Sequence, residues 1–159
     1  MSENRIRKTD NAQPASPGGA GVWVGAVDNT LKYNPDGTTR YVAPIVISVP
    51  LVAASVSETI FTAPFACELV AVSSVHRVAS SSGTLQVQKL TGTTAPGSGT
   101  NLLTGTVSLS GTANTVVSGT PIATVATKRL AAGDRLGFTL AGTLTSLAGC
   151  VVTVTLKQV

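Results

Sequence analysis

The residue types that could carry out chemistry are few in this chain and lie far apart. His76 is the single histidine, and it stands inside the short sequence VHRV. A serine nucleophile needs a base within hydrogen-bond reach and a third group that orients the base. No Gly-x-Ser-x-Gly elbow accompanies this histidine. We therefore expect His76 to be a residue of a strand surface or an interface, and we expect no catalysis.

Acidic and thiol ligands are equally sparse. From residue 59 onward the carboxylates are Glu68 and Asp134, whereas glycoside hydrolysis uses a pair that flanks the bond and a calcium loop uses several. Cys67 and Cys150 have no further cysteine near them, which leaves too few ligands for the usual zinc site. The glycine-rich residues 92–100 lack the lysine of a phosphate-binding loop. These patterns predict no catalytic residue, no metal and no cofactor.

The composition predicts a sheet protein. Hydrophobic residues make up 43% of the 159 residues, but charged residues only 11% and aromatic residues 4%. An ordinary globular protein has about 25% charged residues. Threonine, serine, glycine, alanine and valine take their place, and the β-branched types among them suit a pleated surface. The length allows one full domain.

Short strands separated by turn sequences are expected from residue 58 onward. The expected strands are residues 58–61, 67–78, 84–90, 105–109, 114–117, 122–126, 136–141 and 150–157. In the last of these, positions 152, 154 and 156 are apolar and alternate with Thr153 and Thr155. Strands at this spacing indicate an antiparallel sandwich or barrel. We therefore predict an all-β, antiparallel β-sandwich with an extended N-terminal arm.

Three parts of the chain differ in character. Residues 1–20 are polar and without periodicity, so a flexible tail is expected. Residues 21–58 are expected to form an extended arm with a β-hairpin around the turn sequence Asn-Pro-Asp-Gly at 34–37. Residues 59–159 are expected to form the sandwich.

Within the arm, the apolar residues 45–49, closed by Pro50, are expected to be an edge or swapped strand. The arm also holds the only tryptophan and both tyrosines. Large aromatics are favoured at interfaces because they bury much area at a low cost in entropy. We take Trp23, Tyr33, Arg40 and Tyr41 as candidate partner contacts, and the alternative for Trp23 and Tyr41 is packing onto their own domain.

The net charge of +4 is carried by the C-terminal part. Residues 1–58 balance, whereas residues 59–159 carry six basic residues, which are Arg77, Lys89, Lys128, Arg129, Arg135 and Lys157. These residues are scattered along the sequence, while a nucleic-acid surface usually has a denser basic cluster with aromatics for stacking. We therefore expect no direct nucleic-acid partner. No stretch approaches the ~20 apolar residues that span a bilayer, so no membrane partner is expected either.

A set of short motifs carries a family resemblance. They are FTAP at residues 61–64, LQVQKL at 85–90, APGSGT at 95–100, LAAGDRL at 130–136 and VTVTL at 152–156. In the fourth, glycine supplies a positive φ and Asp134 is expected to clip the turn between two strands. Together the motifs resemble small virion proteins of tailed bacteriophages, most of all the head decoration (cement) class, which has a jelly-roll domain and an N-terminal arm. The resemblance covers residues 59–159, and the arm is similar in architecture only.

The resemblance implies a jelly-roll-like protein that binds and stabilises the expanded capsid shell. Its partner would be the major capsid protein, and it would be a homotrimer on the capsid exterior, made in the host cytoplasm without a cofactor. A second hypothesis is a receptor- or carbohydrate-binding module of a tail fibre or tail tip. Sugar sites typically present aromatic platforms, yet residues 66–159 contain only Phe138 as an aromatic.

The two cysteines are expected to stay reduced. Residues 1–10 are polar and carry no apolar stretch of a secretory signal, so folding in a reducing compartment is expected. Cys67 and Cys150 each begin an expected strand. If these strands lie antiparallel in a jelly roll, the thiols are at opposite ends of the pair and too far apart for a disulfide.

Overall fold

The computed structural model describes residues 21–24, 31–34, 40–41 and 44–159. The chain divides into two units, Met1–Ala43 and Pro44–Val159. In the first unit, strands β1 (Gly21–Val24), β2 (Leu31–Asn34) and β3 (Arg40–Tyr41) form an antiparallel sheet in that order. The pairing of β2 with β3 is the one expected for the hairpin, and the expected tail at residues 1–20 lies outside the described residues.

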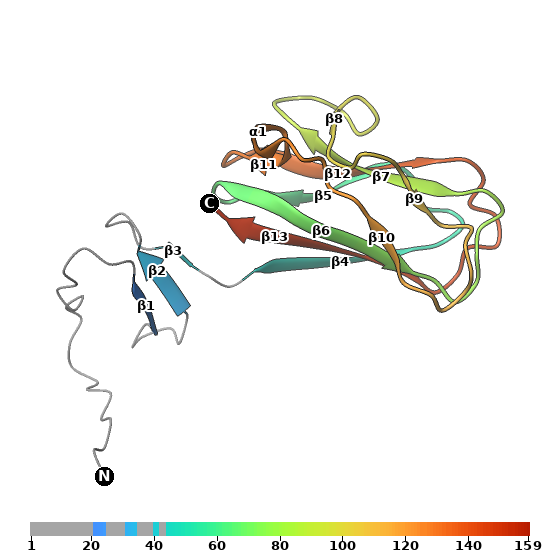
Figure 1. The fold of residues 1–159 in the computed structure, drawn as a ribbon. Coiled ribbons are helices and arrows are strands. Elements are labelled where there is room, and N and C mark those ends of the chain that lie inside the picture. Colours follow the sequence, from blue (N-terminus) through green and yellow to red (C-terminus); the bar gives the residue numbers. More distant parts are fainter. Residues whose placement is uncertain (1–20, 25–30, 35–39, 42–43) are drawn as a thin grey trace, which may run out of the picture. The chain divides into compact units, whose positions relative to one another are not determined.

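The second unit is built from ten strands and one helical turn (Figure 1). They are β4 (Ile45–Leu51), β5 (Glu58–Thr62), β6 (Cys67–Val75), β7 (Thr84–Leu90), β8 (Thr100–Asn101), β9 (Val107–Ser108), β10 (Val117–Gly119), α1 (Val125–Lys128), β11 (Arg129–Leu130), β12 (Arg135–Ala141) and β13 (Cys150–Gln158). One sheet has the order β10-β6-β13-β4, with β11 also paired to β6. The other has the order β5-β12-β7-β8, with β9 also paired to β7.

This strand order is that of a jelly roll. We count the strands of the jelly roll from β4 as the first to β13 as the eighth, with β8 and β9 together as the fifth and β10 and β11 together as the sixth. One sheet then contains the sixth, third, eighth and first strands. The other contains the second, seventh, fourth and fifth, and the strand pairs are antiparallel throughout. Two such sheets face to face are the double-sheet arrangement of jelly-roll domains. The predicted all-β antiparallel sandwich is confirmed.

The first strand of the jelly roll lies before the boundary expected at residue 59. β4 is an edge strand that pairs with β13 along its whole length, from Leu51 opposite Cys150 to Ile45 opposite Leu156. Pro50 lies within β4 and does not close it. Proline is tolerated there because an edge strand has one row of backbone groups that makes no ladder hydrogen bonds. The compact unit accordingly starts at Pro44.

Of the strands expected from residue 58 onward, four differ from the observed ones by more than one residue at an end, and the one expected at 105–109 is reduced to Val107–Ser108. The strand expected at 67–78 ends at Val75, and the one expected at 114–117 begins only at Val117, because Asn114 has φ +58° and forms a turn. Residues 122–126 are not a strand, since Val125–Lys128 is a single helical turn. This segment connects β10 to β11, which both pair with the same edge of β6. Val125 and Thr127, which are β-branched, therefore lie in the connection between β10 and β11 and have no strand partner.

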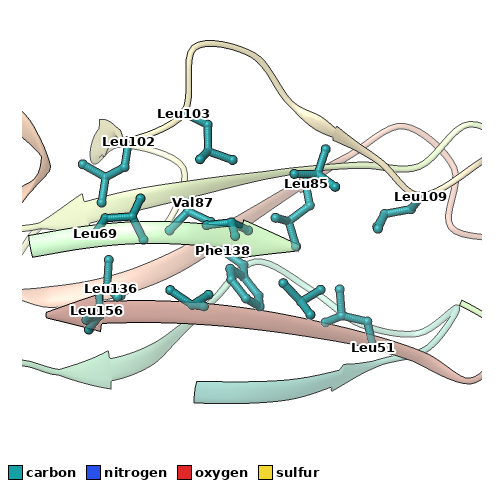
Figure 2. Close-up of a cluster of buried hydrophobic side chains, with 14 of the residues drawn as sticks. Leu51, Leu69, Leu85, Val87, Leu102, Leu103, Leu109, Leu136, Phe138 and Leu156 are labelled. Carbon is teal, nitrogen blue, oxygen red and sulfur yellow. The ribbon is translucent and has the colours of Figure 1, made fainter. Parts of the chain in front are cut away.

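The core is the layer between the two sheets, and Figure 2 shows its leucines around Phe138. The alternation in β13 predicts the core side correctly, because Val152, Val154 and Leu156 are fully buried. On β7, Gln86 and Gln88 are also buried although they alternate with core residues. The segment that follows β7 covers these glutamines. Gln86 donates to and accepts from its backbone, and Gln88 accepts a hydrogen bond from its backbone.

Candidate interaction site

The outer face of the β6-β13-β4 sheet carries no charged side chain over three successive cross-strand rows. Each row takes one residue from each strand, and all are exposed or half-buried. We call these residues the uncharged face: Val75, Val151 and Pro50, then Ser73, Thr153 and Ser48, then Ala71, Thr155 and Val46. Val46 is 58% exposed and Val151 38%. Valine and threonine side chains make this face stiff and weakly polar.

A charge cluster borders the uncharged face at the end where β13 finishes. Glu68 pairs with Lys157 of β13 on one side and with Arg129 of β11 on the other. The Glu68 side chain is only 5% exposed. Its Oε1 lies 3.1 Å from Nζ of Lys128, and its Oε2 lies 3.5 Å from Nζ of Lys157 and 3.6 Å from Nε of Arg129. One buried carboxylate is therefore shared by three cations.

The three cations differ in the exposed fraction of their side chains. Lys128 ends α1, directly before β11, and its side chain is only 20% exposed. Arg129 and Lys157 are 53% and 55% exposed. Burial alone raises the pKa of Glu68, but hydrogen bonds and attraction from Lys128 and Lys157 outweigh it and hold that pKa below the ordinary value. The carboxylate is ionised at neutral pH, and two positive charges remain uncompensated by it.

Two further basic residues lie near this end of the sandwich and donate hydrogen bonds to backbone carbonyls. Lys89 donates from Nζ to the backbone oxygen of Arg129 at 3.1 Å, and Arg135 donates from Nη2 to two carbonyl oxygens of the loop after β7, each at 2.8 Å. We call the five residues the basic end: Lys89, Lys128, Arg129, Arg135 and Lys157. The sixth, Arg77, follows the far end of β6. The fold thus brings basic residues that are far apart in the sequence to one end of the sandwich, and the expectation of no nucleic-acid partner stays a prediction.

A shallow cavity of about 400 Å³ lies within the basic end. Its lining residues are Ala66, Lys89, Arg129, Leu130, Ala131, Asp134 and Val159. Asp134 accepts a 2.8 Å hydrogen bond from the backbone N–H of Ala131, and Gly133 between them has φ +88°. This is the turn clip expected from the motif, so this carboxylate is used in the structure of the turn.

The arm residues chosen from the sequence lie in the N-terminal sheet. Trp23 of β1 is opposite Lys32 of β2, which in turn is opposite Tyr41 of β3. Tyr33 of β2 is opposite Arg40 of β3. The register therefore brings the four candidates onto three adjacent strands, and their role as partner contacts stays a prediction.

The expectation that His76 is a surface or interface residue is wrong, because His76 is fully buried. Its Nε2 lies 3.1 Å from the carbonyl oxygen of Gly111, while its Nδ1 has no hydrogen-bond partner within the described residues. The register of β6 with β13 shifts near Thr155, so Val72 and Ser74 face the core and His76 follows the same alternation. A bulge of this kind reverses which side chains face inward, and the sequence carries no clear signal of it.

The cysteines lie as expected for two separate thiols. Both are buried and free. Cys67 is opposite Gln158 at one end of the β6–β13 pair, whereas Cys150 begins β13 at the other end. Burial raises the pKa of both thiols, and the charge of Asp134 adds to the effect at Cys67.

The part of the chain that the structure describes offers neither a cluster of metal ligands nor a membrane-spanning helix. No group of three or more histidine, cysteine, aspartate or glutamate side chains there could hold a metal ion. No helix among those residues is long and apolar enough to cross a membrane.

Comparisons with known proteins add no relative. No protein-family model matches the chain, and searches of curated proteins and of solved structures find no match.

Proposed function

We propose that this protein is a virion structural protein that binds the expanded shell of a tailed bacteriophage and stabilises it as a head decoration protein. The supporting observation is the uncharged face, a broad sheet surface of a jelly roll with exposed valines and no acid–base pair on it. Such a surface suits lasting contact and not turnover. The short motifs that resemble cement proteins point to the same role, with the major capsid protein as partner and a homotrimer on the capsid exterior.

The energetic logic of this role is linkage. A ligand that binds only one state of a structure stabilises that state by RT ln(1 + [L]/Kd), which is about 2.7 kcal/mol at 100 times Kd. A protein that binds the expanded lattice and not its precursor therefore opposes the internal pressure of packaged DNA. In this proposal Trp23, Tyr33, Arg40 and Tyr41 supply further contacts from the N-terminal unit.

No observation on residues 66–159 supports the tail-fibre alternative. Phe138, the only aromatic of residues 66–159, is fully buried in the core. A sugar platform needs an exposed ring face, and none is offered by this part of the jelly roll. Carbohydrate binding is therefore the weaker proposal for residues 66–159.

The deciding experiment is the copy number of this polypeptide in particles purified from its source, measured by quantitative mass spectrometry against the major shell protein. Hundreds of copies in fixed ratio to the shell subunit are expected, because icosahedral repetition multiplies every site. A few dozen copies or fewer would favour a tail location. Absence from the particles would remove the virion role.

A further inference from the structure

We propose that the partner protein covers the uncharged face and brings a carboxylate to Arg129 and Lys157 at its border. The inference rests on the proposed function, because the partner is then a subunit of the shell. It adds which surface of the jelly roll docks and which chemistry on the partner is recognised, namely an acidic side chain beside a weakly polar area.

The arrangement of charge around Glu68 provides the attraction. Lys128 makes the shortest of the three contacts and is mostly covered, so it already compensates the Glu68 carboxylate. Arg129 and Lys157 make longer contacts of 3.6 Å and 3.5 Å and are more than half exposed. Their contacts with Glu68 hold the two cationic groups in place before a partner arrives. A partner carboxylate can form charge-assisted hydrogen bonds there, and less side-chain entropy is lost on binding.

The exposed valines identify the uncharged face as the surface beside these cations. Lys157 follows Thr155 by two residues on β13, so it continues the outward row of that strand. Val46 lies opposite Thr155, in the row nearest to Lys157. Burying such apolar area contributes about 25 cal/mol per Å², while the charged border fixes orientation and suppresses wrong partners.

A second copy of the same face does not fit as the occupant. Among the described residues, the carboxylates are Glu58, Glu68 and Asp134. Glu68 is buried among its cations, Asp134 is hydrogen-bonded in its turn, and Glu58 lies on β5 in the other sheet. Face-to-face contact between copies would oppose cations to cations or to an uncharged area. The same face of a second copy therefore offers no free carboxylate among the described residues, and we take as the occupant a different protein with its own acidic residue.

A nucleic acid fits less well than a protein. Lys89 and Arg135 are hydrogen-bonded to backbone carbonyls and Lys128 to Glu68, which leaves two exposed cations and not a row that follows a phosphate backbone. Single-stranded nucleic acids also use aromatic rings for stacking. Within residues 66–159 the only ring of this kind, Phe138, is in the core.

The test uses the full-length protein and two neutral variants, Arg129→Gln and Lys157→Gln, with Arg77→Gln as the matched control. Arg77 is exposed and lies beyond the far end of β6, so the control removes one positive charge at the opposite border of the uncharged face, away from Glu68 and its cations. Binding is measured by titrating purified expanded shells, and separately poly-L-glutamate and oligo-dT, at low and moderate salt. Every variant retains the Glu68–Lys128 pair, so each is expected to fold. Thermal unfolding of each variant checks this expectation.

Each site variant is expected to bind shells about tenfold more weakly, which corresponds to about 1.4 kcal/mol, while the control changes less than about twofold. Wild-type binding to poly-L-glutamate is expected to need the same two residues. Unchanged shell binding by both site variants, or an equal loss in the control, would overturn the inference. Stronger binding to oligo-dT than to poly-L-glutamate would overturn it in favour of nucleic acid.

Two further outcomes separate the inference from the proposed function. If the wild type binds poly-L-glutamate through Arg129 and Lys157 but does not bind shells, the capsid role fails and the carboxylate site stands. If it binds neither, both fail. A change of oligomeric mass in the site variants, measured by sedimentation, would show that the face joins copies of this chain and would overturn the choice of a foreign partner.

Discussion

The carboxylate of Glu68 lies 3.1 Å from the ammonium group of Lys128 because a single helical turn ends at that lysine directly before β11 pairs with β6. The turn thus adds a third cation to a carboxylate that already contacts Arg129 and Lys157 of the neighbouring strands. This pair anchors the charge cluster at the border of the uncharged face.

Replacing Glu68 with glutamine is expected to destabilise the protein by about 1.5–3 kcal/mol at neutral pH, the usual contribution of hydrogen bonds to charged groups. The pKa of Glu68 in the folded state is below its ordinary value, so the unfolded state binds its proton first as the pH falls. The stabilisation is therefore complete above about pH 4.5 and is lost as the pH falls through the folded-state value.

The measurement is urea unfolding of wild type and Glu68→Gln from pH 7 to pH 3. The difference between them should shrink below about pH 4.5. Glu58→Gln, which changes an exposed carboxylate on β5, is the control and should alter stability by less than about 0.5 kcal/mol. A Glu68 effect that is equal at all pH values would contradict the linkage argument.

The extent of the second unit predicts different fates for two truncations. A chain that begins at Pro44 keeps β4 and should unfold cooperatively, whereas a chain that begins at residue 59 loses β4 and exposes the edge of β13. An unpaired edge strand is a template for aggregation. Circular dichroism melts and light scattering compare the two, and a soluble, cooperative shorter chain would show that β4 is dispensable. If the arm contacts the shell, the chain that begins at Pro44 should fold yet bind shells more weakly than the full chain.

The thiols should be unreactive in the folded protein. Both are buried with raised pKa values, so the reactive thiolate is scarce at neutral pH. Iodoacetamide should label Cys67 and Cys150 in urea but not under native conditions, which mass spectrometry can follow. The spacing of about eight residues along the strand pair, at ~3.3 Å each, separates them by roughly 25 Å. A native mass lower by two hydrogen atoms would mean a disulfide and would contradict this strand order.

The loop after β7 should depend on Gln86. The Gln86 side chain accepts from the N–H of Leu103 at 3.2 Å and donates to the Leu103 carbonyl at 3.3 Å, so it pairs with that residue as a strand would. Gln86→Ala removes these two bonds, the bond to the Gly105 carbonyl and the bond from the Val87 N–H in a buried place, and should cost about 1–3 kcal/mol. Limited proteolysis should then cut within residues 91–105. Ser118→Ala, at an exposed strand position, is the comparison and should leave the protease pattern unchanged.

Much of the fold follows from local sequence properties. The strand expected at 84–90 has the observed bounds, and the one expected at 150–157 differs from β13 by one residue. Both have a period-2 pattern that depends only on neighbouring residues. The Asp134 turn follows from local chemistry in the same way, because glycine and aspartate determine it within a few residues.

Other features depend on partners that are distant in the sequence. The membership of β4 in the sandwich is decided by β13, about a hundred residues later. The burial of His76 follows from a shift of register between β6 and β13, and α1 forms where the chain has no strand to pair with. None of these can be derived from a short window, because strand pairing is non-local and one bulge reverses the inward and outward faces.

The sequence by itself determined an all-β, charge-poor chain with its turns and most of its strands, because these rest on residue type and short-range periodicity. Only the tertiary structure decided that Arg129, Glu68 and Lys157 stand side by side on three strands. It also placed Lys128 on the same carboxylate. The physical reason is that a sheet aligns residues by register and not by position in the chain, so charges scattered over the sequence become one surface when the strands pair.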